Sequence, residues 1–218
     1  SLMKNYKKNF EILKKNHVYS EEMEHDACGV GLIASTEGKK SRKVVEYGIE
    51  ALKAVWHRGA VDADGKTGDG AGIHVEIPKD FFIEKIEVTG HTHDNSEICV
   101  GMIFLPRNDY AAQESCKTIV ESELTKNDFS IYGWRQVPVN PKVLGEKAFQ
   151  TMPEIIQVLF KSNNPELLNK DLERKIYETR RIIENKAFKI SLNNFYICSL
   201  SSKSIIYKGM FLAEAISD

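Results

Sequence analysis

The order of strand-like and helix-like segments constrains the fold of this 218-residue chain most. Short apolar runs, typical of strands, alternate with longer segments whose apolar residues recur with the helical period. We predict strands at 28–34, 71–77, 97–105, 129–137, 154–160, 194–200 and 203–208, and helices at 41–56, 80–86, 109–126 and 165–186. These segments do not follow the strict strand–helix–strand repeat of a doubly wound parallel sheet. The pattern therefore predicts a layered α+β domain.

Composition narrows the possible partners. The 30 basic and 31 acidic residues nearly cancel, so the net charge of -1 favours neither nucleic acid nor an anionic membrane. No apolar run approaches the ~20 residues of a membrane span. The basic segment 4–10 lacks the apolar stretch of a secretory signal. We expect a cytoplasmic protein without a membrane or nucleic-acid partner.

The four cysteines are widely spaced and form no CxxC pair, which argues against a metal site and a disulfide scaffold. Cys99 and Cys198 lie in apolar strand-like runs, and Cys116 lies on a predicted helix. We expect these three to be buried, reduced thiols. His91 and His93 have no third ligand nearby, so no metal is expected there either.

Cys28 stands apart because it opens an apolar segment directly after the polar leader that ends His25-Asp26-Ala27. This arrangement suggests an N-terminal nucleophile that is exposed when its leader is removed. A free α-amine titrates near ~8 and can accept a proton at neutral pH, whereas a peptide-bonded nitrogen cannot. Cys28 is therefore either a catalyst or an ordinary strand cysteine, depending on the Ala27–Cys28 bond.

A glycine-rich loop at 59–70 joins a predicted helix to a predicted strand. It contains neither a P-loop nor a dinucleotide fingerprint, because the required glycine spacing and element order are absent. An EF-hand that starts at Asp62 fails, since Thr67 and Ile73 stand where glycine and glutamate are required. The loop is either a tight connection or a stretch of backbone that approaches a small ligand or a catalytic terminus.

Together, several motifs resemble the glutamine amidotransferase domain of the glutamate synthase large subunit, a class II domain of the N-terminal-nucleophile type. The motifs are Cys28-Gly29-Val30-Gly31, His57-Arg58-Gly59, Thr67-Gly68-Asp69-Gly70-Ala71-Gly72-Ile73, 132–140, 172–177, 195–202 and 207–210. They cover nearly the whole chain.

The resemblance implies a four-layer αββα sandwich, here truncated, and a thioester mechanism on L-glutamine with Cys28 as nucleophile. Ammonia would pass to a synthase domain that aminates 2-oxoglutarate. No cofactor is expected in this chain; FMN and an iron–sulfur cluster are expected in the rest of the enzyme. Its partners would be the remaining synthase domains, a small subunit and other copies of the chain.

The resemblance also implies roles for residues around Cys28. Gly29, Arg58 and Gly59 become candidates for organising the Cys28 terminus, and Asp69 and Gly70 for holding the loop. A surface ion pair for Arg58 and a turn cap for Asp69 remain the alternatives.

The domain limits follow from the same comparison. Ser1 and Leu2 are interpreted as residues left by cloning before the natural start at Met3, 1–27 as a leader cleaved between Ala27 and Cys28, and 28–218 as the N-terminal part of the domain. The family's motifs of the types HSRFSTN and HNGEIN, with the glutamine-binding arginine and the oxyanion-hole Asn-Gly, do not occur. We predict that the unprocessed chain is inactive. The alternative is a non-catalytic interaction or regulatory module with a degenerate amidotransferase fold.

Overall fold

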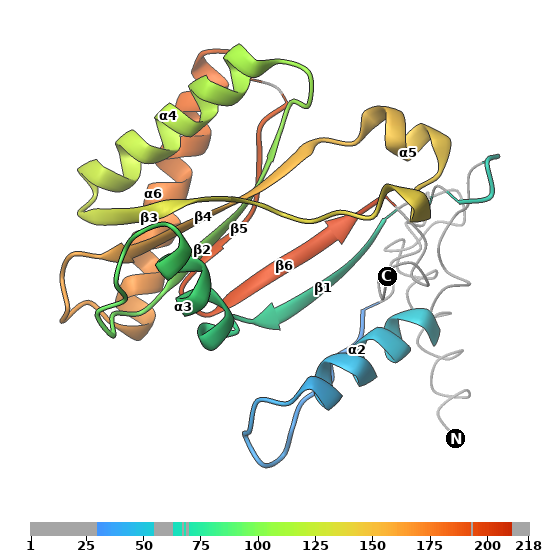
Figure 1. The fold of residues 1–218 in the computed structure, drawn as a ribbon, viewed down its shortest axis with the longest axis horizontal. Coiled ribbons are helices and arrows are strands. Elements are labelled where there is room, and N and C mark those ends of the chain that lie inside the picture. The colour runs from blue at the N-terminus through green and yellow to red at the C-terminus, as the bar shows by residue number, and fades with distance from the viewer. Residues whose placement is uncertain (1–29, 55–62, 67, 69, 193, 211–218) are drawn as a thin grey trace, which may run out of the picture. The chain divides into compact units, whose positions relative to one another are not determined.

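The computed structural model describes residues 30–54, 63–66, 68, 70–192 and 194–210. From Gly31 onward these residues belong to one compact unit. Figure 1 shows its elements: α2 (Arg42–Ala54), β1 (Ala71–Glu76), α3 (Lys79–Val88), β2 (Cys99–Leu105), α4 (Tyr110–Lys126), β3 (Phe129–Gln136), η2 (Pro141–Val143), α5 (Glu146–Thr151), β4 (Glu154–Ser162), α6 (Asn169–Lys189), β5 (Tyr196–Ser201) and β6 (Ser204–Gly209). This mixture of helices and antiparallel sheets confirms the predicted α+β class.

The main sheet has the strand order β3-β4-β2-β5, and every neighbouring pair is antiparallel. The two inner strands, β2 and β4, carry nearly continuous apolar runs instead of alternating ones. Such runs are typical of strands that are covered on both faces. In β2 every residue except Phe104 is buried.

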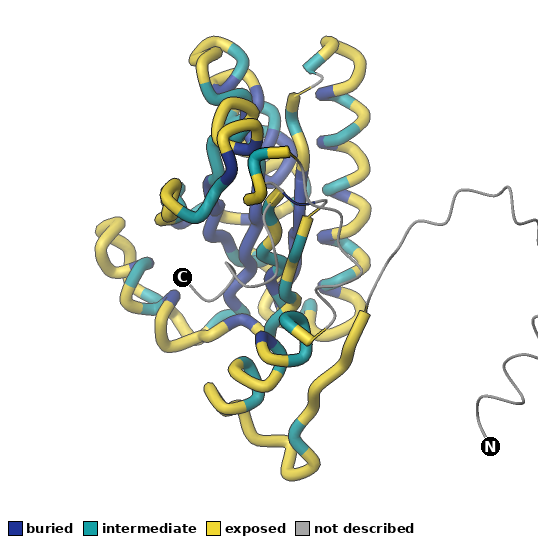
Figure 2. Tube along the Cα trace, turned by 90° about the vertical axis from the view of Figure 1, so that its right-hand side faces the viewer, coloured by how far each residue is buried: buried dark blue, intermediate teal, exposed yellow. Residues whose placement is uncertain are grey.

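The two faces of the main sheet are covered by different elements. Helices α4 and α6 pack on one face, where their buried residues join Ile103, Val158 and Phe160 in one hydrophobic cluster. Helix α3 and strand β6 cover the other face, where Phe82 and Ile205 pack against Met102 and Leu159. Figure 2 shows the buried residues concentrated in the strands and on the inner sides of the helices.

A second sheet contains β1 and β6, which pair antiparallel from Ala71↔Gly209 to Glu76↔Ser204. The short turn from β5 to β6 carries the chain out of the main sheet and into this second one. Helix α2 lies against β1, with Gly48 next to the side chain of Ile73. The described residues thus form a four-stranded sheet covered by α4 and α6 on one face and by α3 and β6 of the small sheet on the other.

Two expectations about elements were wrong. The described part of the predicted strand 28–34, residues 30–34, forms no strand, and Val30 and Leu32 are 90% and 89% exposed. A strand needs a hydrogen-bonded neighbour, and no described strand pairs with this segment. Helix α6 begins at Asn169 instead of 165, because the Asn164 side chain accepts the Glu166 N–H and closes a turn there.

Within the described ranges, no helix is both long enough and apolar enough to span a bilayer.

Candidate active site

Most of the residues predicted for the site lie outside the described part of the chain. Only Gly70 is described; the others are Ala27, Cys28, Gly29, Arg58, Gly59 and Asp69. The structure therefore does not report whether these residues meet. It does show how the described part of the glycine-rich loop is attached to the fold.

Where the loop joins β1, the backbone geometry explains why two positions are glycine. Gly70 has a φ of +132°, a backbone conformation that side chains rarely adopt. A Cβ on Gly72 would lie 2.9 Å from the carbonyl oxygen of Tyr207 and 3.1 Å from Cβ of Lys208. Gly72 is thus required by the close approach of β1 to β6. The requirement for Gly72 is one of packing, whatever the loop binds.

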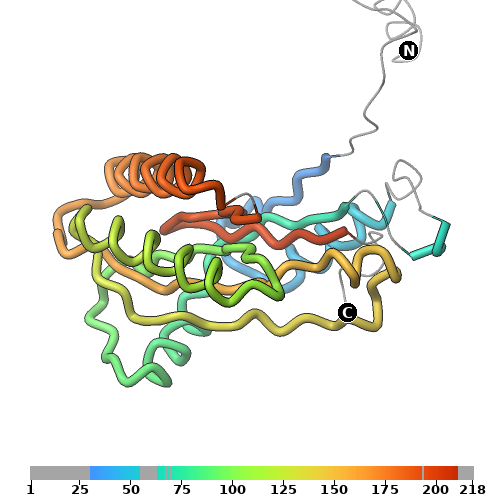
Figure 3. Tube along the Cα trace, turned by 90° about the horizontal axis from the view of Figure 1, so that it is seen from above, coloured from blue at the N-terminus to red at the C-terminus, as the bar shows by residue number. Residues whose placement is uncertain are grey.

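Asp64 connects the loop to a distant helix. Its Oδ1 accepts a hydrogen bond from the Lys66 N–H at 2.9 Å, which tightens the turn, and its Oδ2 accepts one from the Lys147 N–H at 3.4 Å. Lys147 lies in the first turn of α5. Figures 1 and 3 show α5 at the same end of the molecule as the start of β1 and the end of β6.

The three cysteines outside the predicted site are free, buried thiols, as expected from the sequence. Burial raises the pKa of each: that of Cys116 to about 11, and those of Cys99 and Cys198 also above the ordinary value. A buried, protonated thiol is a poor nucleophile. These three residues are therefore poor candidates for a catalytic nucleophile.

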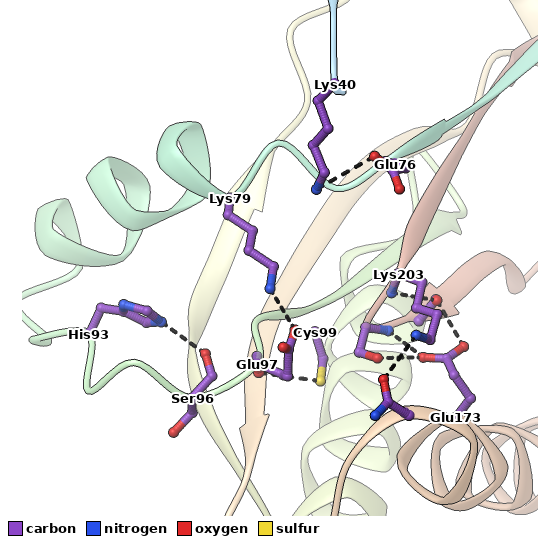
Figure 4. A network of polar contacts seen from close by, with 12 residues as sticks. Lys40, Glu76, Lys79, His93, Ser96, Glu97, Cys99, Glu173 and Lys203 are labelled. Carbon is purple, nitrogen blue, oxygen red and sulfur yellow. Dashed lines mark hydrogen bonds and ion pairs between the residues drawn. The ribbon is translucent and has the colours of Figure 1, made fainter. Parts of the chain in front are cut away.

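A polar hollow of about 190 Å³ lies at the other end of β1 and β6 (Figure 4). Two of its lysines are paired with carboxylates: Lys79 with Glu97 at 2.8 Å and Lys40 with Glu76 at 3.6 Å. Most of the charged side chains that line the hollow are therefore paired with a side chain of opposite charge. Among the residues that the structure describes, no group of three or more His, Cys, Asp and Glu side chains could hold a metal ion.

The sequence prediction missed α5 and the two side chains that hold it, Asp64 and Arg107. The helix-forming run 146–150 after Gly145 was a usable signal for α5. Nothing local to the sequence indicated the contact between Asp64 and Lys147, which are 83 residues apart.

Comparison with known proteins identifies the family. The sequence profile of the glutamine amidotransferases class-II matches residues 28–218, so the match begins at Cys28 itself. The chain belongs to this family, and it is a glutamine amidotransferase domain.

The relatives are glutamate synthases. The chain is 53% identical over 212 residues to the "Glutamate synthase [NADPH] large chain" of Azospirillum brasilense, a match that covers 97% of this chain and 14% of that protein. It is 37% identical over 211 residues to the "Ferredoxin-dependent glutamate synthase 2, chloroplastic" of Arabidopsis thaliana, with 95% of this chain and 13% of that protein covered. The predicted resemblance to the glutamate synthase amidotransferase domain is confirmed. The chain spans about one seventh of the length of these relatives.

Proposed function

We propose that this chain carries the nucleophile of the glutaminase half-reaction of a glutamate synthase. The observation that carries this proposal is the family match, which starts at Cys28 and runs to the last residue of the chain. The burial of Cys99, Cys116 and Cys198 supports it, because Cys28 is then the one cysteine of the chain left as a candidate nucleophile.

In the proposed reaction, leader residues 1–27 are first removed between Ala27 and Cys28. The freed α-amine takes the thiol proton, and the Cys28 sulfur attacks the side-chain carbonyl carbon of L-glutamine. The carbon–nitrogen bond breaks as the α-ammonium returns the proton to the leaving nitrogen, which releases ammonia. Water then hydrolyses the thioester to glutamate and restores the thiol. With the leader attached the amine is blocked, so we expect no turnover.

The remaining parts of the proposal concern the larger assembly. Ammonia passes to a synthase domain that aminates 2-oxoglutarate, and FMN and an iron–sulfur cluster belong to that part of the enzyme. We also propose that the enzyme binds a small subunit, that the chain associates with other copies of itself, and that the protein is cytoplasmic. The names of the two relatives support the link to a glutamate synthase.

We also propose that further strands extend the second sheet, which then forms one of the two inner layers of a four-layer αββα sandwich. Among the described residues, β1 and β6 pair only with each other, while helices already lie on the outer side of each sheet.

The test is glutamine hydrolysis by the processed full-length protein, measured as glutamate and ammonia released. Cys28→Ser is expected to lower the rate on the order of 10³-fold or more, because both the thioester and its activated thiol are lost. The matched control Cys116→Ala removes a buried thiol and is expected to keep the activity. Undiminished turnover in Cys28→Ser would overturn the assignment and favour a non-catalytic module.

A further inference from the structure

Helix α5 belongs to an excursion between two strands of the main sheet. The chain leaves β3 at Gln136 and re-enters β4 at Glu154. The Val137 N–H donates to the Ile155 carbonyl at 3.1 Å, which closes the base of the excursion. Residues 138–153 therefore extend from the core and carry α5 to the end where the glycine-rich loop enters β1 (Figures 1 and 3).

Arg107 holds the helix from the core side. It lies two residues after the end of β2, and its Nη1 donates to the Phe149 carbonyl at 3.3 Å. Its guanidinium also lies 5.0 Å from the centroid of the Phe149 ring. The Phe149 carbonyl also accepts the Met152 N–H at 3.4 Å, so the arginine adds a second hydrogen bond at the C-terminal end of the helix.

Asp64 holds the same helix from the loop side. The residue before α5, Gly145, has no side chain with which to cap the helix. The Asp64 carboxylate is an acceptor for the Lys147 N–H, and its other oxygen accepts the Lys66 N–H. A carboxylate in this position is a favourable cap. One side chain thus joins a turn of the loop to α5.

We propose that α5, clamped between Arg107 and Asp64, positions the glycine-rich loop relative to the core, with Asp64 as a positioning residue for the glutaminase reaction. This inference rests on the proposed function, because the loop matters for catalysis only if its residues organise the Cys28 terminus. Arg58 and Gly59 lie a few residues before Asp64, and Asp69 a few residues after it. If these residues organise the Cys28 terminus, as the proposed function has it, a displaced turn at 63–66 would displace them as well.

The experiment compares variants of the processed full-length protein. Asp64→Ala is expected to lower kcat for glutamine hydrolysis about 10- to 100-fold, as misplaced active-site groups do, while KM changes less than about threefold. Asp64→Asn, which keeps one acceptor oxygen, is expected to be intermediate. The matched control Glu146→Gln removes a carboxylate from the same first turn of α5 without touching the loop, and is expected to behave as wild type.

Arg107→Ala tests the clamp from its other side. If both residues act through α5, the double variant loses about as much as the more severe single variant, and the losses do not multiply. Multiplied losses would show that the two residues act independently, which contradicts the clamp.

Amide hydrogen exchange gives a readout that does not depend on glutamine. In Asp64→Ala the Lys66 and Lys147 amides are expected to exchange faster, while those of β2 and β4 keep their protection. Unchanged exchange at Lys147, wild-type kcat in Asp64→Ala, or an equal loss in Glu146→Gln would each overturn the proposal. If the wild-type protein hydrolyses no glutamine, the proposed function fails, and the exchange data still decide whether Asp64 holds α5.

Discussion

The surroundings of each thiol decide its reactivity. Cys99 lies in the inner strand β2, Cys116 on the buried side of α4, and Cys198 in β5 with its sulfur near the Ile206 carbonyl. Burial raises the pKa of each of these thiols, so they remain protonated at neutral pH. A cysteine of this chain that reacts at neutral pH must therefore lie outside the buried positions of these three.

We predict that iodoacetamide at pH 7 modifies Cys28 first among the four cysteines of this chain in the processed full-length protein. The reason is that reagents attack the thiolate and must reach it. Peptide mapping by mass spectrometry measures the labelling, and the control in guanidinium is expected to label all four. Faster modification of a cysteine in β2, α4 or β5 would contradict the burial described here.

Gly72 shows how tightly two strands approach one another. We predict that Gly72→Ala lowers the free energy of unfolding by about 1–3 kcal/mol, because its Cβ would meet the Tyr207 carbonyl oxygen. Chemical denaturation of the chain measures the change. The control Gly31→Ala adds a methyl group where no atom lies within 4 Å and is expected to be nearly neutral. Equal stability of the two variants would refute the close approach.

At the scale of elements, one carboxylate ties the two long helices together. Glu123 on α4 is buried, and its Oε1 accepts hydrogen bonds from Lys186 of α6 and, at 3.4 Å, from Lys126. The hydrogen bond from Lys186 is the main cause that holds the pKa of Glu123 below its ordinary value of 4.5. A lowered pKa means that the folded state favours the ionised carboxylate.

The pH dependence follows from that direction. The contribution of Glu123 to stability is present above pH 4.5 and is lost as the pH falls through the lowered pKa of the folded state. We predict that Glu123→Gln lowers the free energy of unfolding by about 1–2 kcal/mol at pH 7, and that the difference shrinks in acid. Urea denaturation at several pH values measures it. Glu114→Gln, which breaks an exposed pair with Lys117 on the same helix, is the control with little expected effect.

Elements with a strong local pattern could be predicted, and those that depend on distant partners could not. The buried run of β2 and the long amphipathic segment of α4 appear in the structure close to the predicted bounds, because β2 is covered on both faces and α4 buries one side. Helix α5 has only six residues and gains its support from Arg107 and Asp64, neither of which is near it in sequence. The motif around Cys28 identified the family, but residues 30–34 form no strand, because pairing with a neighbouring strand is not a local property.

At the scale of the whole molecule, the second sheet has few strands for a sheet that covers part of another. Within the described residues it consists of β1 and β6 alone, although it covers part of a four-stranded sheet. Two-stranded sheets are marginal by themselves, and their open edges invite further strands.

In the proposed reaction, Cys28 becomes the first residue of the working enzyme. N-terminal sequencing of the natural full-length protein, together with its intact mass, shows whether the leader has been removed. We expect the mature chain to begin Cys28-Gly29-Val30-Gly31, with the leader through Ala27 absent. An active protein that retains residues upstream of Cys28 would refute the proposed reaction, because the nitrogen of Cys28 would then be peptide-bonded and could not serve as the base.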